Sequence, residues 1–434
     1  MEKKYFLQLS IYVWSLMIIS ASNCVCAVEF DKEHVLYRGE DAVEFSRNPQ
    51  NSIGVDSGGR IHLAYFIPDQ SSSSPDNRIM YLTVENGETS SPVRVDSTDM
   101  GGGRHPSLVI DSKDAVHVVW QDYRHTTATG NYIDNIEIYY DSTSIDGRFA
   151  LEDLRLTDTN ASHKGDNGYV PNIAIGNDNR IHVTWYDYTS NGNNADIYLQ
   201  SSDVNGVFPI QSGIEDFCIT DVHENPADYT SNWLPDVCTM PDGSVYVVWG
   251  FLTGWQGTFE LQGRAVSADG VLGDIDVIAP KGSNFSDPPR LAADKKGNMA
   301  IVYSVYTDGM YQVNVQYKPM DGMWSDAVRV NDGTNDSSQP SIAFDSQGNA
   351  HLVWQEDFGG IYQVAYARFD PQAMSVDNRA VLSSEYADAR TPAIALHPVT
   401  DLINVVWIDR WVEGERSIVG RNEIYTAVEY WQLY

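Results

Sequence analysis

Two histidines in the first third of the chain stand where proton transfer could take place. His105 directly precedes Pro106, and His125 follows the run Trp120-Gln121-Asp122-Tyr123-Arg124. The two are 20 residues apart, and the segment between them has the pattern of a β-hairpin, so we expect the two imidazoles to meet at one end of it. Imidazole titrates near neutral pH, so such a pair can act as general acid and base.

Arginines and aromatic residues occupy the neighbouring and corresponding places. Arg104 and Arg124 flank the two histidines and predict a site for an anionic substrate. The corresponding positions further along the chain hold two phenols, an indole and another arginine: Tyr169, Tyr188, Trp233 and Arg264. We expect the arginines and the indole to bind the substrate, and the histidines and phenols to transfer protons.

A third group has the residue types that bind zinc. Cys218 and Cys238 bracket a segment that contains His223. Thiolates and imidazole, with one further ligand, form structural zinc sites. Export favours a disulfide instead, but the two cysteines belong to different repeat copies, which strains the required Cα separation of below ~7 Å. A disulfide, a structural zinc and two free thiols stay open, and the catalysis needs no cofactor.

These residues lie in a repeated pattern of short strands. An apolar strand, usually begun by proline, precedes a strand that ends in an aromatic residue, and a β-branched and aromatic strand follows. The aromatic markers of the second strands are Tyr65, Trp120, Trp185, Trp249, Tyr303, Trp354 and Trp407. Repeats of about 50 to 65 residues without helical periodicity are typical of a β-propeller.

The seven copies predict an all-β, seven-bladed β-propeller of four-stranded antiparallel blades, a single catalytic domain over residues 28–434. The last copy ends after its third strand, so we expect the segment from His34 to Phe45 to close the ring. The starts of the first strands and the ends of the second strands share one face, where functional residues converge. Histidines that recur three residues before the marker are expected to be packing residues: His62, His117, His182 and His351.

Composition excludes several classes of function. The chain has 434 residues, with 28 Lys and Arg against 60 Asp and Glu, which gives a formal net charge of −32. Such a surface repels phosphate backbones and anionic lipids, so a nucleic-acid-binding protein is excluded. With 42% hydrophobic residues the chain can bury a large core and is not disordered.

Residues 1–27 have the pattern of a signal peptide. Two lysines near the start precede an apolar run from Leu7 to Ser20, and Val25-Cys26-Ala27 offers a cleavage site. A lipoprotein with its lipid on Cys24 or Cys26 is the alternative that Asn23 disfavours. No later stretch reaches the ~18 apolar residues of a membrane helix. We expect a monomeric protein, secreted or periplasmic, without membrane contact after cleavage.

The chain resembles the ulvan lyases of polysaccharide lyase family 25, and family 24 shares the architecture. The resemblance is carried by His105-Pro106, by Trp120-x-Asp122-x-Arg124-His125, and by the tyrosines of the third copy. It implies β-elimination of a sulfated polysaccharide of rhamnose 3-sulfate and uronic acid, which leaves 4,5-unsaturated uronate ends. It also implies that a histidine and one of the tyrosines transfer protons, that an arginine lies near the uronate, and that a structural zinc is present. Thr189 stands where the second copy has Arg124, so the arginine that faces the carboxylate is left open.

Two other functions fit the same residues. A non-catalytic, lectin-like propeller would tend to repeat its site in several copies. Here the basic and aromatic set belongs to the second to fourth copies, whereas the fifth and sixth have Asp287-Pro288 and Ser338-Gln339. That asymmetry favours a single active site that takes an anionic polysaccharide. A lyase for another uronate polymer would use the same chemistry.

Overall fold

The computed structural model describes residues 34–35, 44–46, 49–68, 77–97, 102–125, 127–129, 132–134, 136–143, 147–150, 152–157, 168–188, 194–209, 217–220, 230–253, 258–285, 287–383, 385, 388–409 and 425–429. The predicted signal peptide over residues 1–27 and the predicted zinc ligand His223 lie outside these ranges. Within them, no helix has the length and apolarity needed to cross a membrane.

The second repeat copy shows why the chain forms its sheets. β8 (Val116–Asp122) is rich in β-branched residues, and all seven of its residues are buried. It pairs with β7 (Arg104–Ile110) on one side and with β11 (Glu137–Ser142) on the other, and β12 (Leu154–Arg155) adds the outer edge. A strand that is buried on both faces needs a neighbouring sheet on each side, and a ring of sheets provides both.

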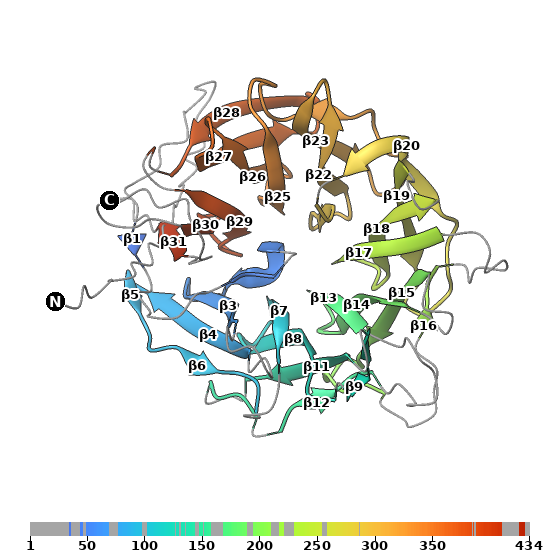
Figure 1. Ribbon diagram of the computed structural model, residues 1–434, viewed down its shortest axis with the longest axis vertical. Coiled ribbons are helices and arrows are strands. Elements are labelled where there is room, and N and C mark those ends of the chain that lie inside the picture. Colours follow the sequence, from blue (N-terminus) through green and yellow to red (C-terminus); the bar gives the residue numbers. More distant parts are fainter. Residues whose placement is uncertain are drawn as a thin grey trace.

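Other copies repeat this arrangement around the ring (Figure 1). The first has β2 (Ile53–Val55), β3 (Ile61–Ile67), β4 (Arg78–Glu85), β5 (Glu88–Thr89) and β6 (Val93–Arg94). The third has β13 (Gly168–Ile175), β14 (Ile181–Tyr188), β15 (Ala195–Ser201) and β16 (Phe217–Cys218). The sixth has β25 (Ser337–Phe344), β26 (Ala350–Asp357), β27 (Tyr362–Asp370) and β28 (Ser375–Val381). The seventh has β29 (Ala389–Leu396), β30 (Ile403–Asp409) and β31 (Tyr425–Glu429), and β1 (His34–Val35) pairs with β31 as its outer strand.

The prediction of seven blades is wrong, because the described strands of the ring form six sheets. The fourth and fifth copies share one eight-stranded sheet, which consists of β17 (Thr230–Thr239), β18 (Val245–Thr253), β19 (Thr258–Val266), β20 (Asp276–Phe285), β21 (Arg290–Ala293), β22 (Met299–Thr307), β23 (Met310–Lys318) and β24 (Val328–Arg329). The cause is β20, which is ten residues long and pairs with β19 between Asp276 and Ser283 and with β22 at its last two residues. The protein is therefore an all-β propeller of six blades, one of them of double width.

A short 3-10 helix, η1 (Pro49–Ser52), lies at the centre of the ring, where Figure 1 shows it in blue. Asn51 Nδ2 donates a hydrogen bond of 2.5 Å to Asn172 Oδ1 on β13. Gln50 Nε2 donates one of 2.9 Å to the carbonyl of Leu291 on β21. The helix therefore connects the third and fifth copies, which are not neighbours in the ring, through hydrogen bonds at the centre of the propeller.

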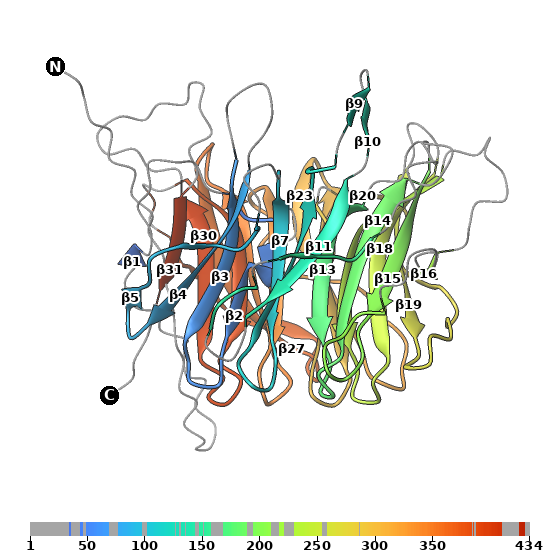
Figure 2. The same cartoon turned by 90° about the horizontal axis from the view of Figure 1, so that it is seen from below.

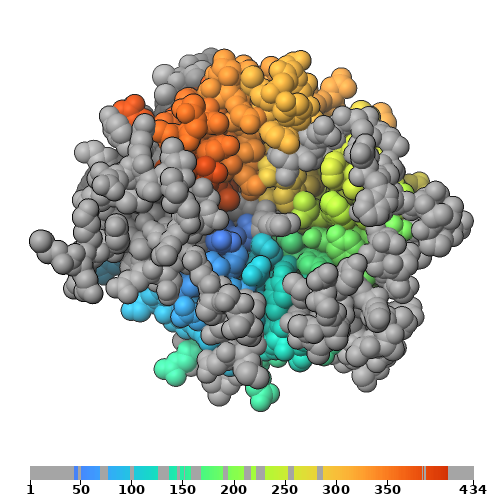
Figure 3. All heavy atoms as spheres, in the orientation of Figure 1, coloured from blue at the N-terminus to red at the C-terminus, as the bar shows by residue number. Residues whose placement is uncertain are grey.

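The two faces of the ring differ. We call the face at which the first strands begin and the second strands end the entrance face. It is at the top of Figure 2, where the hairpin of β9 (Thr127–Thr129) and β10 (Tyr132–Asp134) rises above the blades. Tight turns such as Asp345–Asn349 form the opposite face. Figure 3 shows the entrance face, with the blue segment around η1 near its centre.

The four histidines that recur three residues before the markers are buried, as the repeat predicted. Their Nδ1 atoms lie within hydrogen-bonding distance of hydroxyls on the third strands, and His182 uses Ser201 Oγ at 2.8 Å. In three copies an aspartate from the tight turn lies beside the same imidazole: Asp56–His62–Tyr81, Asp111–His117–Tyr140 and Asp345–His351–Tyr366. These histidines connect the turns to the third strands and belong to the packing of the blades.

We predict that His182 makes the fold sensitive to acid. Burial lowers its pKa to about 4; nearby Asp178 acts in the opposite direction and Arg180 in the same direction. In the unfolded chain a histidine has a pKa of about 6.5, so between these values the unfolded state binds a proton that the native state does not. The contribution to stability is therefore complete above about pH 6.5 and falls by at most about 3 kcal/mol as the pH approaches 4.

The test compares thermal unfolding of the wild type and His182→Gln from about pH 7 to about pH 4.5. Glutamine can retain a hydrogen bond to Ser201 but has no proton to gain, so the variant should lose less stability than the wild type. Parallel curves for the two proteins would show that the imidazole does not resist protonation in the native state.

Candidate functional site

The first strands share a kink at the entrance face. In five copies a residue near the start of this strand has a positive φ and is followed by proline: His105, Val170, Leu234, Gln339 and Thr391, with φ between 46° and 55°. The strand register shifts at the same place in these five copies. A left-handed backbone at a non-glycine residue often marks a functional site. Here it recurs in copies with unrelated side chains, so it belongs to the architecture.

The register places three predicted site residues at one structural position. Arg104 lies opposite Gln121, Tyr169 opposite Tyr186, and Trp233 opposite Gly250. In each pair the second residue directly follows the marker tryptophan. An arginine, a phenol and an indole therefore occupy the same place on three consecutive copies, at the entrance face. The sequence predicted that the third and fourth copies hold counterparts of the residues around His105, and the strand pairing gives Tyr169 and Trp233 the position that Arg104 has in the second copy.

Arg104 carries a charge without a counter-ion among the described residues. It is half-buried, and its guanidinium carbon lies 5.3 Å from the centre of the Tyr123 ring, within the range of a cation–π contact. Its Nε atom is buried and has no hydrogen-bond partner in the described part of the chain. No described carboxylate lies within ion-pair distance of it either. A cation held in this way is a ready partner for an anionic group.

Three phenols form a cluster on the next copy. Tyr169 stacks on Tyr186 with ring centres 5.3 Å apart, and Tyr188 meets both rings edge-on at 5.6 and 6.0 Å. Tyr169, Tyr188 and Trp233 pack on the same apolar cluster between the third and fourth copies. The predicted tyrosines and the indole are therefore brought together, on the side of the second copy that Gln121 faces.

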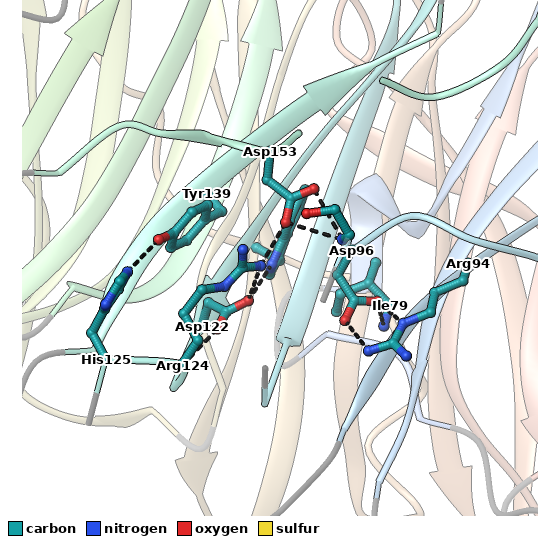
Figure 4. A network of polar contacts seen from close by, with 10 residues as sticks. Ile79, Arg94, Asp96, Asp122, Arg124, His125, Tyr139 and Asp153 are labelled. Atoms are coloured by element: carbon teal, nitrogen blue, oxygen red, sulfur yellow. Dashed lines mark hydrogen bonds and ion pairs between the residues drawn. The ribbon is translucent and has the colours of Figure 1, made fainter. Parts of the chain in front are cut away.

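The two predicted histidines face different surroundings. His105 meets the ring of Phe66, on the first copy, edge-on at 5.7 Å. His125 is exposed, stacks on Tyr139 of β11, and places Nε2 2.5 Å from the phenol oxygen (Figure 4). Burial lowers the pKa of His125, and the charges of Arg155 and Arg124 act in the same direction. The imidazole of His125 is thereby favoured in its neutral form, and the two histidines rest against the rings of different blades.

Arg124 is held by carboxylates of the blade itself. Its Nη2 lies 2.7 Å from Asp122 and 2.6 Å from Asp153, and its guanidinium covers the Tyr139 ring at 4.0 Å (Figure 4). Asp122 also accepts a hydrogen bond from Trp120 Nε1 at 3.0 Å. Burial would lower the pKa of Arg124, but hydrogen bonds and charge from the two aspartates raise it overall.

The sixth copy has the same arrangement with other residues. Trp354 Nε1 donates to Glu356, and Arg379 bonds both carboxylate oxygens of that glutamate at 2.7 and 2.8 Å. An arginine on a carboxylate that also accepts from the marker tryptophan is thus a repeated element of the fold. The run from Trp120 to Arg124 has a structural explanation, and the predicted role of Arg124 in substrate binding would require it to exchange partners.

Arg264 lies on β19, opposite Val247 in the middle of its sheet. It is 7% exposed. Its guanidinium donates to the carbonyls of Gly273 and Ile219 at 2.6 to 2.9 Å. These bonds connect the third and fourth copies and occupy the side chain. The structure therefore does not bring Arg264 together with Arg104 at the entrance face.

Cys218 and Cys238 are thiols and are not joined by a disulfide. Cys238 packs in the apolar cluster between β17 and β22, and burial raises its thiol pKa. Cys218 is followed by Ile219, which packs between the third and fourth copies, so the Cys218 side chain points to the opposite face of its strand. Its Sγ lies 3.2 Å from the carbonyl of Thr220. The two side chains thus point away from each other, which explains why they do not bond.

The predicted zinc site is only partly described, because its ligand His223 lies outside the described ranges. No group of three histidine, cysteine, aspartate or glutamate side chains within the described ranges could hold a metal ion. A thiol in an apolar cluster with a raised pKa is also a poor zinc ligand, because zinc binds the thiolate. Cys238 contributes to the apolar packing of its blade.

Sequence reasoning missed three residues of this region. Tyr123 supports Arg104, Tyr139 contacts His125, and Gln121 lies between Tyr123 and the third copy. A signal for Tyr123 was available, because it stands three residues after the marker, as Tyr188 does in the next copy. Nothing in the sequence marks Tyr139, which resembles Tyr198, another third-strand tyrosine stacked on its marker tryptophan.

Comparison with known proteins shows the fold. No family model and no curated protein matches the chain. A solved ulvan lyase of polysaccharide lyase family 25, bound to -[GlcA(1-4)Rha3S]-, aligns with a TM-score of 0.58 over 89% of this chain and 93% of its own, at 10% identity. The polysaccharide lyase Uly1 aligns with a TM-score of 0.54 over 98% of both chains, at 8% identity.

A protein of unknown function from Dyadobacter fermentans DSM 18053 aligns with a TM-score of 0.51 over 75% of this chain and 97% of its own, at 12% identity. At such low identities these similarities establish a shared propeller fold. The two lyases share it along almost the whole chain.

Arg124 and Arg104 should differ sharply in their effect on stability. Arg124→Met leaves two buried carboxylates without their cation, which costs about 3–5 kcal/mol of unfolding free energy. Arg104→Met removes a cation that has no described carboxylate partner, so the cost should be below about 1 kcal/mol. Denaturant unfolding of both variants measures the difference. Equal losses would contradict the assignment of Arg124 to the frame of the blade.

The thiols should react at different rates. Cys238 is 7% exposed and its pKa is raised by burial, whereas Cys218 is half-buried on a strand at the sheet edge. Because the thiolate is the reactive form, a thiol reagent should modify Cys218 first in the native protein and Cys238 only after denaturation. Mass spectrometry of the labelled peptides identifies the order. Recovery of both as a disulfide would contradict the structure.

Proposed function

We propose that the protein is a secreted polysaccharide lyase that cleaves a sulfated, uronate-containing polysaccharide of the ulvan type by β-elimination. The observation that carries the proposal is Arg104, a cation without a described counter-ion at the entrance face, on the copy that precedes the one with the phenols. Support comes from the propeller fold, which is shared with two polysaccharide lyases along most of the chain.

Arg104 suits the first requirement of this reaction. The proton on C5 of a uronate is hard to remove while the adjacent carboxylate keeps its full charge. A guanidinium on that carboxylate offsets the charge and stabilises the enolate-like intermediate. Arg104 is better placed for this than Arg124 and Arg264, since the first is held by two carboxylates and the second by main-chain carbonyls.

The second requirement is a pair of proton carriers. One group takes the C5 proton, the C4–O4 bond breaks, and the other group donates a proton to the departing O4 oxygen. We assign these transfers to His105 and to one of the phenols Tyr169 and Tyr188. His125, whose pKa is lowered by partial burial and by the charges of two arginines, is assigned to substrate orientation or to a share in the proton transfer. Trp233 would stack on a sugar ring next to the phenols.

Arg104 differs from many other arginines of the protein, whose charges are neutralised by carboxylates. In a chain of net charge −32, many arginines are held by carboxylates. The described ion pairs include Arg60–Glu85, Arg94–Asp96, Arg155–Glu137, Arg368–Asp377, Arg379–Glu356 and Arg390–Asp388. An anionic polymer would therefore meet repulsion over most of the surface and attraction at an arginine that has no such pair among the described residues.

Mixing the purified protein with ulvan should produce ultraviolet absorbance from the conjugated C4–C5 double bond. Arg104→Met should lower kcat/KM about 100- to 1000-fold, because it removes a group that stabilises developing charge. Tyr188→Phe and Tyr169→Phe identify the proton-transferring phenol, since only one of them should abolish turnover.

Arg390→Met is the matched control for Arg104→Met. Arg390 holds the equivalent place on β29, opposite Ile408, and its guanidinium lies 4.1 Å from the Tyr362 ring centre, but Asp388 neutralises it. Its replacement should leave turnover unchanged. A flat trace on ulvan and on other uronate polymers, with binding retained, would replace the lyase by a carbohydrate-binding propeller. Turnover on another uronate polymer alone would change the substrate and keep the chemistry.

A further inference from the structure

Gln121 connects the arginine side of the proposed site to its phenol side. We propose that Gln121 is a positioning residue for the elimination, which holds Tyr123 under Arg104 and sets the place of Tyr169. This inference rests on the proposed function, because it assigns Gln121 to the same site. The glutamine belongs to no motif that marks it in the sequence, and its role follows from its contacts alone.

The contacts of Gln121 use both ends of its amide. Its side chain is 2% exposed. Nε2 donates a hydrogen bond of 2.8 Å to the phenol oxygen of Tyr123. Oε1 accepts one of 2.8 Å from the main-chain N–H of Val170, on the next copy. A buried amide with a partner at each end has one orientation, so the residues at its two ends are fixed relative to each other.

On the arginine side, the amide determines where the Tyr123 ring lies. Arg104 is opposite Gln121 in the strand register, and its guanidinium rests over that ring at 5.3 Å. Because Arg104 has no described ion pair to hold it, the ring face and the strand position are what place its charge. A shift of the phenol would move the cation with it.

On the phenol side, the amide holds the kink of β13. Val170 has φ of 46°, a conformation that a β-branched residue adopts only under constraint from its surroundings. The bond from its N–H to Gln121 supplies part of that constraint. Tyr169 directly precedes Val170 and stacks on Tyr186, so the position of the kink sets the position of the predicted proton-transferring phenol.

The sixth copy contains the same glutamine without the site. Gln355 follows its marker tryptophan, and Oε1 accepts a 3.0 Å hydrogen bond from the N–H of Thr391, the kink residue of the next copy. Its Nε2 donates to Ser338 Oγ at 3.0 Å instead of to a phenol. Gln355 therefore holds the kink of the next copy, as Gln121 does, but it contacts no phenol. It provides a matched control for Gln121.

The first experiment compares Gln121→Met with Gln355→Met. Each variant leaves one main-chain N–H of a kink without its acceptor, so both should show a similar fall in melting temperature. Gln121→Met should also lower kcat/KM for ulvan about 100-fold, since a small misplacement of reacting groups has an effect of this size. Gln355→Met should leave kcat/KM unchanged. Equal kinetic losses in the two variants would reduce Gln121 to a structural residue and overturn the inference.

The second experiment introduces a negative charge at position 121, opposite Arg104. Gln121→Glu keeps an acceptor for Val170 N–H but places a carboxylate opposite Arg104, which supplies a counter-ion within the blade. The variant should therefore raise KM for ulvan about tenfold or more, because the substrate carboxylate must displace a charged partner. Gln355→Glu, opposite Ser338, should not change KM. An unchanged KM in Gln121→Glu would contradict the placement of Arg104 beside Gln121.

Binding of a glucuronate–rhamnose 3-sulfate tetrasaccharide, measured by calorimetry, separates the inference from the proposed function. If the wild type does not cleave ulvan but binds this probe, and Gln121→Glu weakens the binding while Gln355→Glu does not, the lyase function fails, and of the inference only the placement of Arg104 by Gln121 stands, as part of a binding site. If the wild type cleaves ulvan but Gln121→Glu and Gln355→Glu behave alike, the function stands and the inference fails. Absence of both turnover and binding would overturn both.

Discussion

Buried hydrogen bonds near the axis connect the first strands of neighbouring copies. The positions of the blades and of the side chains at the entrance face depend on these bonds. Ser107 Oγ donates to Asn172 Oδ1, the amide of Asn172 donates to Asp236, and Asp236 accepts from the N–H of Leu291. The three side chains have no exposed surface. Buried polar groups are costly unless they are paired, so each of these residues requires its neighbour in the next copy. The second to fifth copies are connected to one another in this way.

The position of the predicted site residues follows from the same constraint. Ser107, Asn172 and Asp236 each come directly after the proline of a kinked first strand. The residue two positions before that proline is then directed toward the entrance face: Arg104, Tyr169 and Trp233. The kink therefore separates two positions of the first strand. The position after the proline lies at the axis and is polar in all three copies, whereas the position two residues before the proline lies at the entrance face and holds a different residue type in each copy. This explains how one architecture can carry an arginine, a phenol and an indole without a change in the frame.

Much of this could be predicted from the sequence, because the repeat is a local pattern. The strands, their order, the buried histidines and the correspondence between Arg104, Tyr169 and Trp233 all depend on spacing along the chain. The number of blades could not be predicted from the sequence. β20 pairs with strands of two copies through main-chain hydrogen bonds, and these do not require particular residue types. The partners of Arg124 could not either, since Asp153 is 29 residues away and lies on no recognisable strand pattern.

The difference between the two predicted arginines lies in what compensates their charge. Both belong to the second copy, and each lies over a phenol ring, at 5.3 Å for Arg104 and 4.0 Å for Arg124. Their residue type and their place beside a histidine make them alike in the sequence. Two carboxylates neutralise Arg124, so an incoming anion gains little from it, whereas no described carboxylate compensates the charge of Arg104 in this strongly acidic protein. Under the proposed function, a surface that repels anions over most of its area would direct an anionic polymer to Arg104, because the positive charge there is not compensated by a described carboxylate.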